Sequence, residues 1–400
     1  MRNIQTNSKK NNSLLKSLNS YFHPINDEIF FNKDKWETTQ IGRLVDFHTN
    51  NHFPVIKNTA IAIFNIDEYY GSENNPSKTF CKIRDSLYKL HSNNLPKIID
   101  LGSIKLESTR KETFKVIEDV CSFLLSNNII PFVIGGGHDI SYAVYKAYVS
   151  LQKTITFCSV DKNFDIGLQQ DKLASYSFFS KILSHTPSHL FHYVNLGYQT
   201  FSNSHMAIEM LNGMNFDIYR LGYLKEKMNE VEPVMRNTDF VSFDLSSIQH
   251  SYSAANIYSS PNGFTGEEAC KIMRYAGISD KLTAIGIFEY NQSLDNNNQT
   301  AQLISQMIWY FLEGYKQRKK ELNPNLKNCT KYTVAFEDGK NEIIFFKSNI
   351  SGRWWMGVPF KIDGKDIEDN YFVACSYQDY ELANKGEIPE RWIKTYRKFD

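Results

Sequence analysis

The sequence predicts a doubly wound α/β fold built around a mainly parallel sheet. Short apolar runs recur from Asn58 onward, and each run ends in a polar or glycine-rich turn. Runs without polar alternation are typical of strands buried on both faces, as in parallel sheets. Segments with helical spacing separate the runs, and this alternation of strand and helix is the doubly wound pattern. The predicted strands cover residues 60–65, 97–101, 129–134, 155–160, 193–196, 240–245 and 283–288.

Three amphipathic stripes predict the helices of this fold. Their apolar positions recur every three or four residues within 114–124, 140–148 and 303–312, which places them on one face of a helix. We therefore expect an α/β domain over residues 57–320.

The two ends of the chain have a different character. Residues 1–56 are predicted to be a polar N-terminal arm with irregular structure and one short helix at 13–22. Residues 321–400 are predicted to be a C-terminal extension that contains strands. Two strand-like runs there, 332–337 and 342–347, flank Asp338-Gly339, which is a strong hairpin signal.

Composition narrows the classes of function. The chain is 42% hydrophobic and 22% charged, and its formal charge is +1, so nothing favours binding to nucleic acid or to an anionic membrane surface. Because no run of about 18 apolar residues exists, no membrane span is expected. The six cysteines lack two-residue spacing and several lie in apolar runs, which favours a reducing, cytoplasmic location.

Polar side chains follow four of the predicted strands. In parallel α/β sheets, ligands bind beyond the carboxyl ends of the strands. A histidine with several carboxylates is a suitable ligand set for Mn²⁺ or a similar divalent ion, and Asp139 and Glu289 are further candidates for catalysis. The residues in these positions are His138, Asp139, Asp161, Asp165, Asp244 and Glu289.

Each of these features alone has an ordinary structural explanation. A glycine run such as 135–137 often forms a tight turn, a buried histidine is often a core residue, and an Asp at a strand end often caps a helix. Neither a phosphate-binding loop nor a dinucleotide fingerprint is present, since the required Lys-Ser/Thr and third glycine are missing.

In combination, the motifs resemble the ureohydrolase family, which includes arginase, agmatinase and formimidoylglutamase. The resemblance is carried by 132–139, 161–165 and 242–244, with further matches at 100–102, 263–268 and 289–301. It covers about residues 57–320, and segments 175–179 and 196–199 are most similar to the formimidoylglutamase branch.

The resemblance implies a three-layer α/β/α fold with a dinuclear manganese centre. Such a centre activates a water for hydrolysis of a C–N bond in a linear amidine or guanidino compound. The family's ligands for the first ion match His138, Asp161, Asp165 and Asp244, and all four are present.

The ligands for the second ion are altered. Where the family has a His and an Asp, this chain has Asn163 and Ser246. An amide and a hydroxyl are neutral and weaker donors to a transition metal. We therefore expect one divalent ion or none, with Mn²⁺ the expected metal. In the loop 174–179, polar groups that contact substrate in arginase-like members are largely replaced by aromatic side chains.

Three further features are open to two interpretations. Lys162 could neutralise a carboxylate in place of the missing ion, or it could be a solvated loop residue. His185, His189 and His192 have metal-like spacing, but Pro187 favours a surface loop. Trp354-Trp355 could form an exposed binding patch, although burial between the extension and the main domain is the more ordinary outcome.

Two functions from different classes remain. The preferred hypothesis is a catalytically inactive or impaired ureohydrolase-like protein that binds a partner through its terminal extensions. The alternative is a working metal-dependent amidine hydrolase of formimidoylglutamase or arginase type. A sensor that binds a small amidine or guanidino ligand without turnover is not separable from the first hypothesis, and the resemblance leaves a homo-oligomer open.

Overall fold

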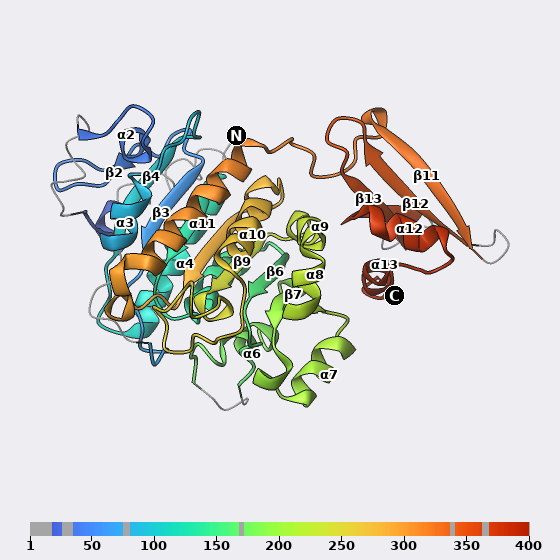
Figure 1. Cartoon of the computed structure of the whole chain (residues 1–400), viewed down its shortest axis with the longest axis horizontal. Helices are drawn as coiled ribbons and strands as arrows, with labels where there is room; N and C mark the ends of the chain where they lie inside the picture. Colours follow the sequence, from blue (N-terminus) through green and yellow to red (C-terminus); the bar gives the residue numbers. More distant parts are fainter. Residues whose placement is uncertain are drawn as a thin grey trace, which may run out of the picture.

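The computed structural model of the chain describes residues 18–25, 35–74, 81–167, 172–336, 341–361 and 368–399. A ten-stranded sheet crosses the main part in the order β1-β4-β3-β5-β10-β9-β6-β7-β8, with β2 also paired to β4 (Figure 1). All its strand pairs are parallel except β1–β4. The strands are β1 (Phe22–His23), β2 (Asp46–Phe47), β3 (Ile61–Asn65), β4 (Ile98–Ile104), β5 (Ile130–Ile134), β6 (Ile155–Val160), β7 (Leu190–Tyr198), β8 (Asp217–Arg220), β9 (Phe240–Asp244) and β10 (Ala284–Phe288).

The seven predicted strands are all present in this sheet, and the predicted α/β class is confirmed. Alternate residues of each inner strand enter opposite cores, as Ile61 and Ala62 do, which explains why their sequences are apolar without alternation. The short strand β8 was not predicted, because its residues are half-buried or, at Arg220, exposed and form no apolar run.

Helices cover both faces of the sheet and produce the three layers. One core contains side chains of α3 and α8 to α11, and the other contains side chains of α4 to α7. The three predicted stripes lie on α4, α5 and α11. The helices are α2 (Ile41–Leu44), α3 (Cys81–Leu87), α4 (Arg110–Ser126), α5 (Ile140–Ser150), α6 (Phe178–Leu183), α7 (His205–Gly213), α8 (Leu221–Glu226), α9 (Val231–Arg236), α10 (Gly266–Ile278) and α11 (Gln299–Lys316).

The N-terminal range is more integrated than a polar arm. Within its described part, β1 and β2 both pair with β4, and Phe22, Ile41, Val45 and Phe47 are buried. The helix predicted at 13–22 lies partly outside the described residues. Its described end is helical, with Leu18 in α conformation and a 3₁₀ turn at Asn19–Tyr21, and strand β1 begins at Phe22.

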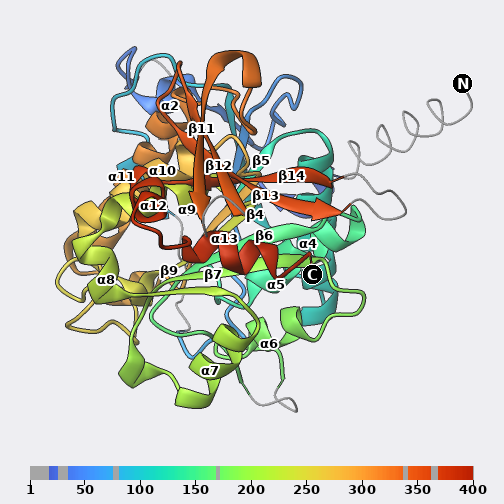
Figure 2. The ribbon, with the colours of Figure 1, turned by 90° about the vertical axis from the view of Figure 1, so that its right-hand side faces the viewer.

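The C-terminal extension is a four-stranded antiparallel sheet with two helices, as Figure 2 shows in front of the main part. The predicted hairpin strands are confirmed, while Asp338-Gly339 lies outside the described residues. The sheet has a core of its own that includes Phe345, Trp354 and Met356. The elements are β11 (Cys329–Phe336), β12 (Asn341–Ser348), β13 (Trp354–Lys361), β14 (Glu368–Cys375), α12 (Tyr377–Asn384) and α13 (Glu390–Tyr396).

Arg236, at the end of α9, attaches this extension to the main domain. Its guanidinium is buried and donates hydrogen bonds to the carbonyl oxygens of Trp354 at 3.1 Å and Cys375 at 3.0 Å. It also pairs with Glu232 and lies 5.0 Å from the Trp355 ring. Both tryptophans are buried, so they form no exposed patch: Trp354 packs inside the extension and Trp355 at the junction.

Replacing Arg236 by alanine is expected to destabilise the junction. The change leaves two buried carbonyl groups without their donor and Glu232 with only the more distant Arg353, at 3.8 Å, and removing one partner of a buried network costs roughly 3 kcal/mol. Urea unfolding followed by tryptophan fluorescence would measure this loss. The exposed Arg220→Ala variant is the control and should change the free energy of unfolding by less than about 0.5 kcal/mol. Equal effects of the two changes would contradict this role of Arg236.

Within the described residues, no helix combines the length and the apolar character that crossing a bilayer requires.

Candidate metal centre

The predicted site residues lie at the ends of four adjacent strands in the middle of the sheet, β5, β10, β9 and β6. His138 follows β5, Asp161 and Asp165 follow β6, Asp244 is the last residue of β9, and Glu289 follows β10. Because these strands are parallel, their carboxyl ends meet at one edge, and the side chains from four separate segments come together there.

The backbone at this edge is unusually constrained. Gly135 and Gly136 have φ of 85° and 77°, a region that favours glycine, and a Cβ on Gly136 would lie 2.9 Å from the Glu68 carbonyl oxygen. Two residues of the site, Asp165 and Glu289, also have positive φ, of 53° and 67°. Left-handed conformations in non-glycine residues are uncommon and cluster at functional sites.

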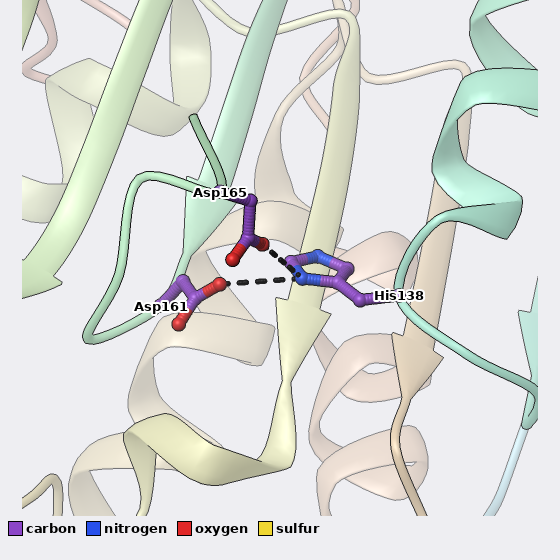
Figure 3. Close-up of side chains that lie close together, drawn as sticks. All are labelled: His138, Asp161 and Asp165. Carbon is purple, nitrogen blue, oxygen red and sulfur yellow. Dashed lines mark ion pairs between the residues drawn. The ribbon is translucent and has the colours of Figure 1, made fainter. Parts of the chain in front are cut away.

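Three carboxylates surround one nitrogen of His138. Its Nδ1 lies 2.9 Å from Asp165 Oδ2, 3.2 Å from Asp161 Oδ2 and 3.4 Å from Asp244 Oδ2. Figure 3 shows the imidazole facing Asp161 and Asp165. The ligand atoms of His138, Asp161 and Asp165 all lie within 4.8 Å of one another, and Asp244 stands at the margin of this group.

Ser242 determines the orientation of the imidazole. Its Oγ lies 2.7 Å from His138 Nε2 and 2.7 Å from Ser141 Oγ, all inside the protein. When Nε2–H donates to this serine, the Nδ1 lone pair faces the carboxylates. A hydrogen bond on the far nitrogen is the usual way in which a protein holds a metal-binding histidine.

The electrostatics of this group call for a cation. Burial disfavours the charged imidazolium, but Asp161, Asp165 and Asp244 outweigh it and raise the pKa of His138. For Asp161 and Asp165, burial disfavours the charged carboxylate and raises the pKa. His138 Nδ1 and Asp161 Oδ2 are buried without a hydrogen-bond partner. The Nδ1 nitrogen of His138 and the carboxylate oxygens of Asp161 and Asp165, with Asp244 at the margin, therefore fit a single divalent ion such as Mn²⁺.

Asn163 and Ser246, at the positions of the second ion's ligands, fit a second cation less well. The backbone N–H of Asn163 donates to Asp161 Oδ1 at 2.9 Å, and that of Ser246 donates to Asp244 Oδ1 at 2.6 Å. Each carboxylate thus uses its other oxygen within its own loop. The Ser246 hydroxyl is buried and has no hydrogen-bond partner, so it is a neutral donor at this position.

Glu289 forms a second polar group beside the first. Its carboxylate accepts hydrogen bonds from Ser72 Oγ and Ser175 Oγ, both at 2.6 Å, and from the His138 backbone N–H at 2.8 Å. Burial and the charge of Asp244 raise the pKa of Glu289 to about 7, while its three donors oppose that shift. These three donors hold the carboxylate of Glu289 in a fixed orientation.

Asp139, the other predicted catalytic candidate, has a different environment. Its Oδ2 pairs with Arg110, which also contacts Glu68 and the Leu173 carbonyl oxygen. Burial raises the pKa of Asp139 to about 6, and Arg110 acts against that rise. These contacts favour a role for Asp139 in holding loops together beside the centre.

The remaining candidates lie outside the cluster. Lys162 donates to the Tyr258 carbonyl oxygen and has no ion-pair partner among the described residues, so it does not neutralise a carboxylate there. His192 belongs to β7, whereas His185 and His189 precede that strand, and the three form no metal cluster within the described chain. The aromatic loop packs inward, with Phe178 4.6 Å from the His138 ring.

Sequence reasoning missed several residues that organise the site. Ser72 and Arg110 come from segments without a motif, and Ser175 lies in a loop whose sequence is mainly aromatic. Ser242 had a usable signal, because a polar side chain in a strand buried on both faces needs a reason.

Comparisons with known proteins agree with this geometry. The arginase family model matches residues 76–313. The formimidoylglutamase of Bacillus subtilis is 23% identical over 231 residues, covering 55% of this chain and 72% of that protein. That of Staphylococcus haemolyticus is 26% identical over 261 residues, covering 60% and 82%.

Solved structures show the same fold. A formiminoglutamase of Trypanosoma cruzi, crystallised with Mn²⁺, superposes with a TM-score of 0.60 at 21% identity, covering 66% of this chain and 96% of that one. The Bacillus subtilis formimidoylglutamase structure gives 0.60 at 21% identity, covering 70% and 93%. The family match spans more than half of the 400 residues and includes every residue of the cluster. The chain therefore belongs to the arginase family.

Proposed function

We propose that this protein is a metal-dependent hydrolase of linear amidines, of the formimidoylglutamase type, that works with one divalent ion. The observation that carries the proposal is the cluster of His138, Asp161 and Asp165, with the carboxylate of Asp244 at its margin. The relatives named above support hydrolysis better than the inactive binding protein that the sequence alone favoured.

A divalent ion held there, Mn²⁺ by analogy with the relatives, would lower the pKa of a bound water and so supply a nucleophile near neutral pH. The residues of the chain provide the remaining functions. The four donors hold the cation, and Ser242 fixes the imidazole for it. Glu289, held by two serines, offers a carboxylate to the amidinium group of the substrate, whose positive charge it complements.

The direct test is an assay of the Mn²⁺-loaded chain with N-formimino-L-glutamate, L-arginine and agmatine. Release of formamide from the first substrate, or of urea from the others, would establish hydrolysis and rank the substrates. The Glu289→Gln variant keeps the shape but removes the charge, and we expect it to lower kcat/KM at least about 100-fold. The exposed Glu267→Gln variant on α10 is the matched control and should keep full activity.

A second candidate function is supported by Asn163 and Ser246. If the second ion is indispensable for turnover, the protein binds a small amidine or guanidino compound without hydrolysing it and acts as a binding or scaffold protein. Calorimetric binding of N-formimino-L-glutamate with no formamide release would support this function. In this function, a protein partner would contact the terminal extensions, and the chain would also assemble into homo-oligomers.

We also propose a cytoplasmic location. Cys121, Cys158, Cys270, Cys329 and Cys375 are free thiols, which is usual in a reducing compartment.

A further inference from the structure

Solvent reaches the metal centre from the side of two of its carboxylates. The side chains of His138 and Asp161 are fully buried, whereas those of Asp165 and Asp244 keep 8% and 10% of their surface exposed. A substrate therefore approaches from the side of Asp165 and Asp244. Residues beside those two carboxylates are placed to contact the part of the substrate that does not react.

Tyr258 lies beside this approach, in the segment between β9 and α10, and is 40% exposed. Its hydroxyl donates to Glu73 Oε2 at 2.8 Å, in the loop after β3, and its backbone N–H donates to Asn256 Oδ1 at 2.7 Å. Partial burial raises the pKa of the Tyr258 hydroxyl most, Glu73 adds to the rise, and the nearby charges of Glu289 and Asp244 add further. Tyr258 therefore joins two loops at the rim of the centre.

Lys162 reaches the same rim from the loop after β6. It directly follows the metal ligand Asp161 in the chain, and the Cα atoms of neighbouring residues are about 3.8 Å apart. Its carbonyl oxygen accepts hydrogen bonds from the Gln199 N–H at 3.0 Å and from Asn203 Nδ2 at 2.8 Å, which fixes its backbone. Because its Nζ donates to the Tyr258 carbonyl oxygen, the side chain of Lys162 is directed to the rim.

The ammonium group of Lys162 pairs with no carboxylate of the described residues. An ammonium has three N–H donors, and the Tyr258 carbonyl oxygen takes one of them, so two are left for a ligand or for water. Arg110, by contrast, already pairs with Glu68 and Asp139. A carboxylate that enters beside the centre therefore finds an available cation in Lys162.

We propose that Lys162 selects amidine substrates that carry a carboxylate at the end remote from the amidine carbon, by binding that carboxylate at the rim. The inference rests on the proposed hydrolysis, in which Glu289 faces the cationic end of the substrate. Opposite charges at the two ends of the site then fix the direction in which the substrate lies, and a compound with an ammonium in place of the carboxylate is repelled. A charge-assisted hydrogen bond of this kind changes affinity about 10- to 100-fold.

Two substrates that differ in one charge test this role. N-formimino-L-glutamine has a neutral amide where N-formimino-L-glutamate has its remote carboxylate. In the Mn²⁺-loaded full chain, we expect kcat/KM to be at least about 10-fold higher for the glutamate compound, through a lower KM at similar kcat. Lys162→Met should reduce this preference to less than about 2-fold, whereas Lys162→Arg keeps the charge and should keep most of it. Lys153→Met, at an exposed lysine before the start of β6, is the control and should keep all of it.

Binding measurements separate a failure of this inference from a failure of the proposed reaction. If no formamide is released, titration calorimetry of the Mn²⁺-loaded chain gives the two Kd values, and we expect the same preference and the same loss in Lys162→Met. Equal binding of the two compounds, binding of neither, or a preference that survives in the methionine variant would refute the role of Lys162. If Lys162→Met is unstable or loses Mn²⁺, Lys162→Gln, which keeps a donor for the Tyr258 carbonyl oxygen, decides by the same criterion.

Discussion

Replacing Asp161 by alanine is expected to abolish Mn²⁺ binding at the centre and amidine hydrolysis with it. Asp161 Oδ2 is fully buried, 3.2 Å from the His138 ring nitrogen, and has no hydrogen-bond partner, while Oδ1 accepts from the Asn163 backbone N–H. The site is expected to hold one ion, so no second ion keeps the remaining ligands in place when this donor is removed. We expect metal content to fall from one ion per chain to almost none and kcat/KM to fall at least about 1000-fold.

Metal analysis after dialysis against Mn²⁺ and formamide release would measure the two losses. Asp119→Ala, at a partly exposed carboxylate on α4, is the control and should change neither. In chelator, the alanine variant should be no less stable than the parent, because one of several buried carboxylates that repel each other has been removed. Full activity of Asp161→Ala would show that the cluster does not carry the reaction.

The fold could be predicted from the sequence because the strands and the site obey simple rules. Strands such as β5 and β9 are buried on both faces and so read as uninterrupted apolar runs. Parallel strands end at one edge, so polar residues at or shortly beyond the ends of β5, β6 and β9 had to meet. That rule located His138, Asp161 and Asp244 without coordinates.

The rest depended on contacts between segments that carry no local signal. Ser72 and Ser175 reach Glu289 across 217 and 114 positions of sequence, and their loops have no periodicity. Arg110 begins an ordinary amphipathic helix, and only the structure shows that it pairs with Asp139. For the same reason, the role of 1–56 in the sheet was not predicted, because β1 and β2 are two residues each.

The number of ions separates the two proposed functions more sharply than the fold does. The set around His138 is complete, and the neighbouring positions offer Asn163 and Ser246. The Ser246 hydroxyl is buried and lacks a hydrogen-bond partner, so its surroundings leave a polar atom without a use in the metal-free chain. A carboxylate at position 246 would be buried in the same place, so it would need a second cation to balance its charge.

Replacing Asn163 by His and Ser246 by Asp together is therefore expected to raise Mn²⁺ uptake from one ion to two per chain. The change places an imidazole and a carboxylate beside Asp161 and Asp244. In the parent chain, the Oδ1 atoms of these two residues accept hydrogen bonds from backbone N–H groups. If the present chain is a one-ion hydrolase, kcat/KM should rise about 10- to 100-fold, because two ions stabilise the developing charge better than one.

Each single replacement supplies only one new ligand and should leave the content near one, which makes the two single variants the matched controls. The double variant should also be less stable than the parent in chelator, by about 2 kcal/mol, because a carboxylate at position 246 is buried without a cation, and Mn²⁺ should restore the loss. A content that stays at one, with no stabilisation by Mn²⁺, would mean that these two positions do not face a second ion at all. The difference between this chain and a dinuclear hydrolase would then have to lie elsewhere in the loops around Glu289.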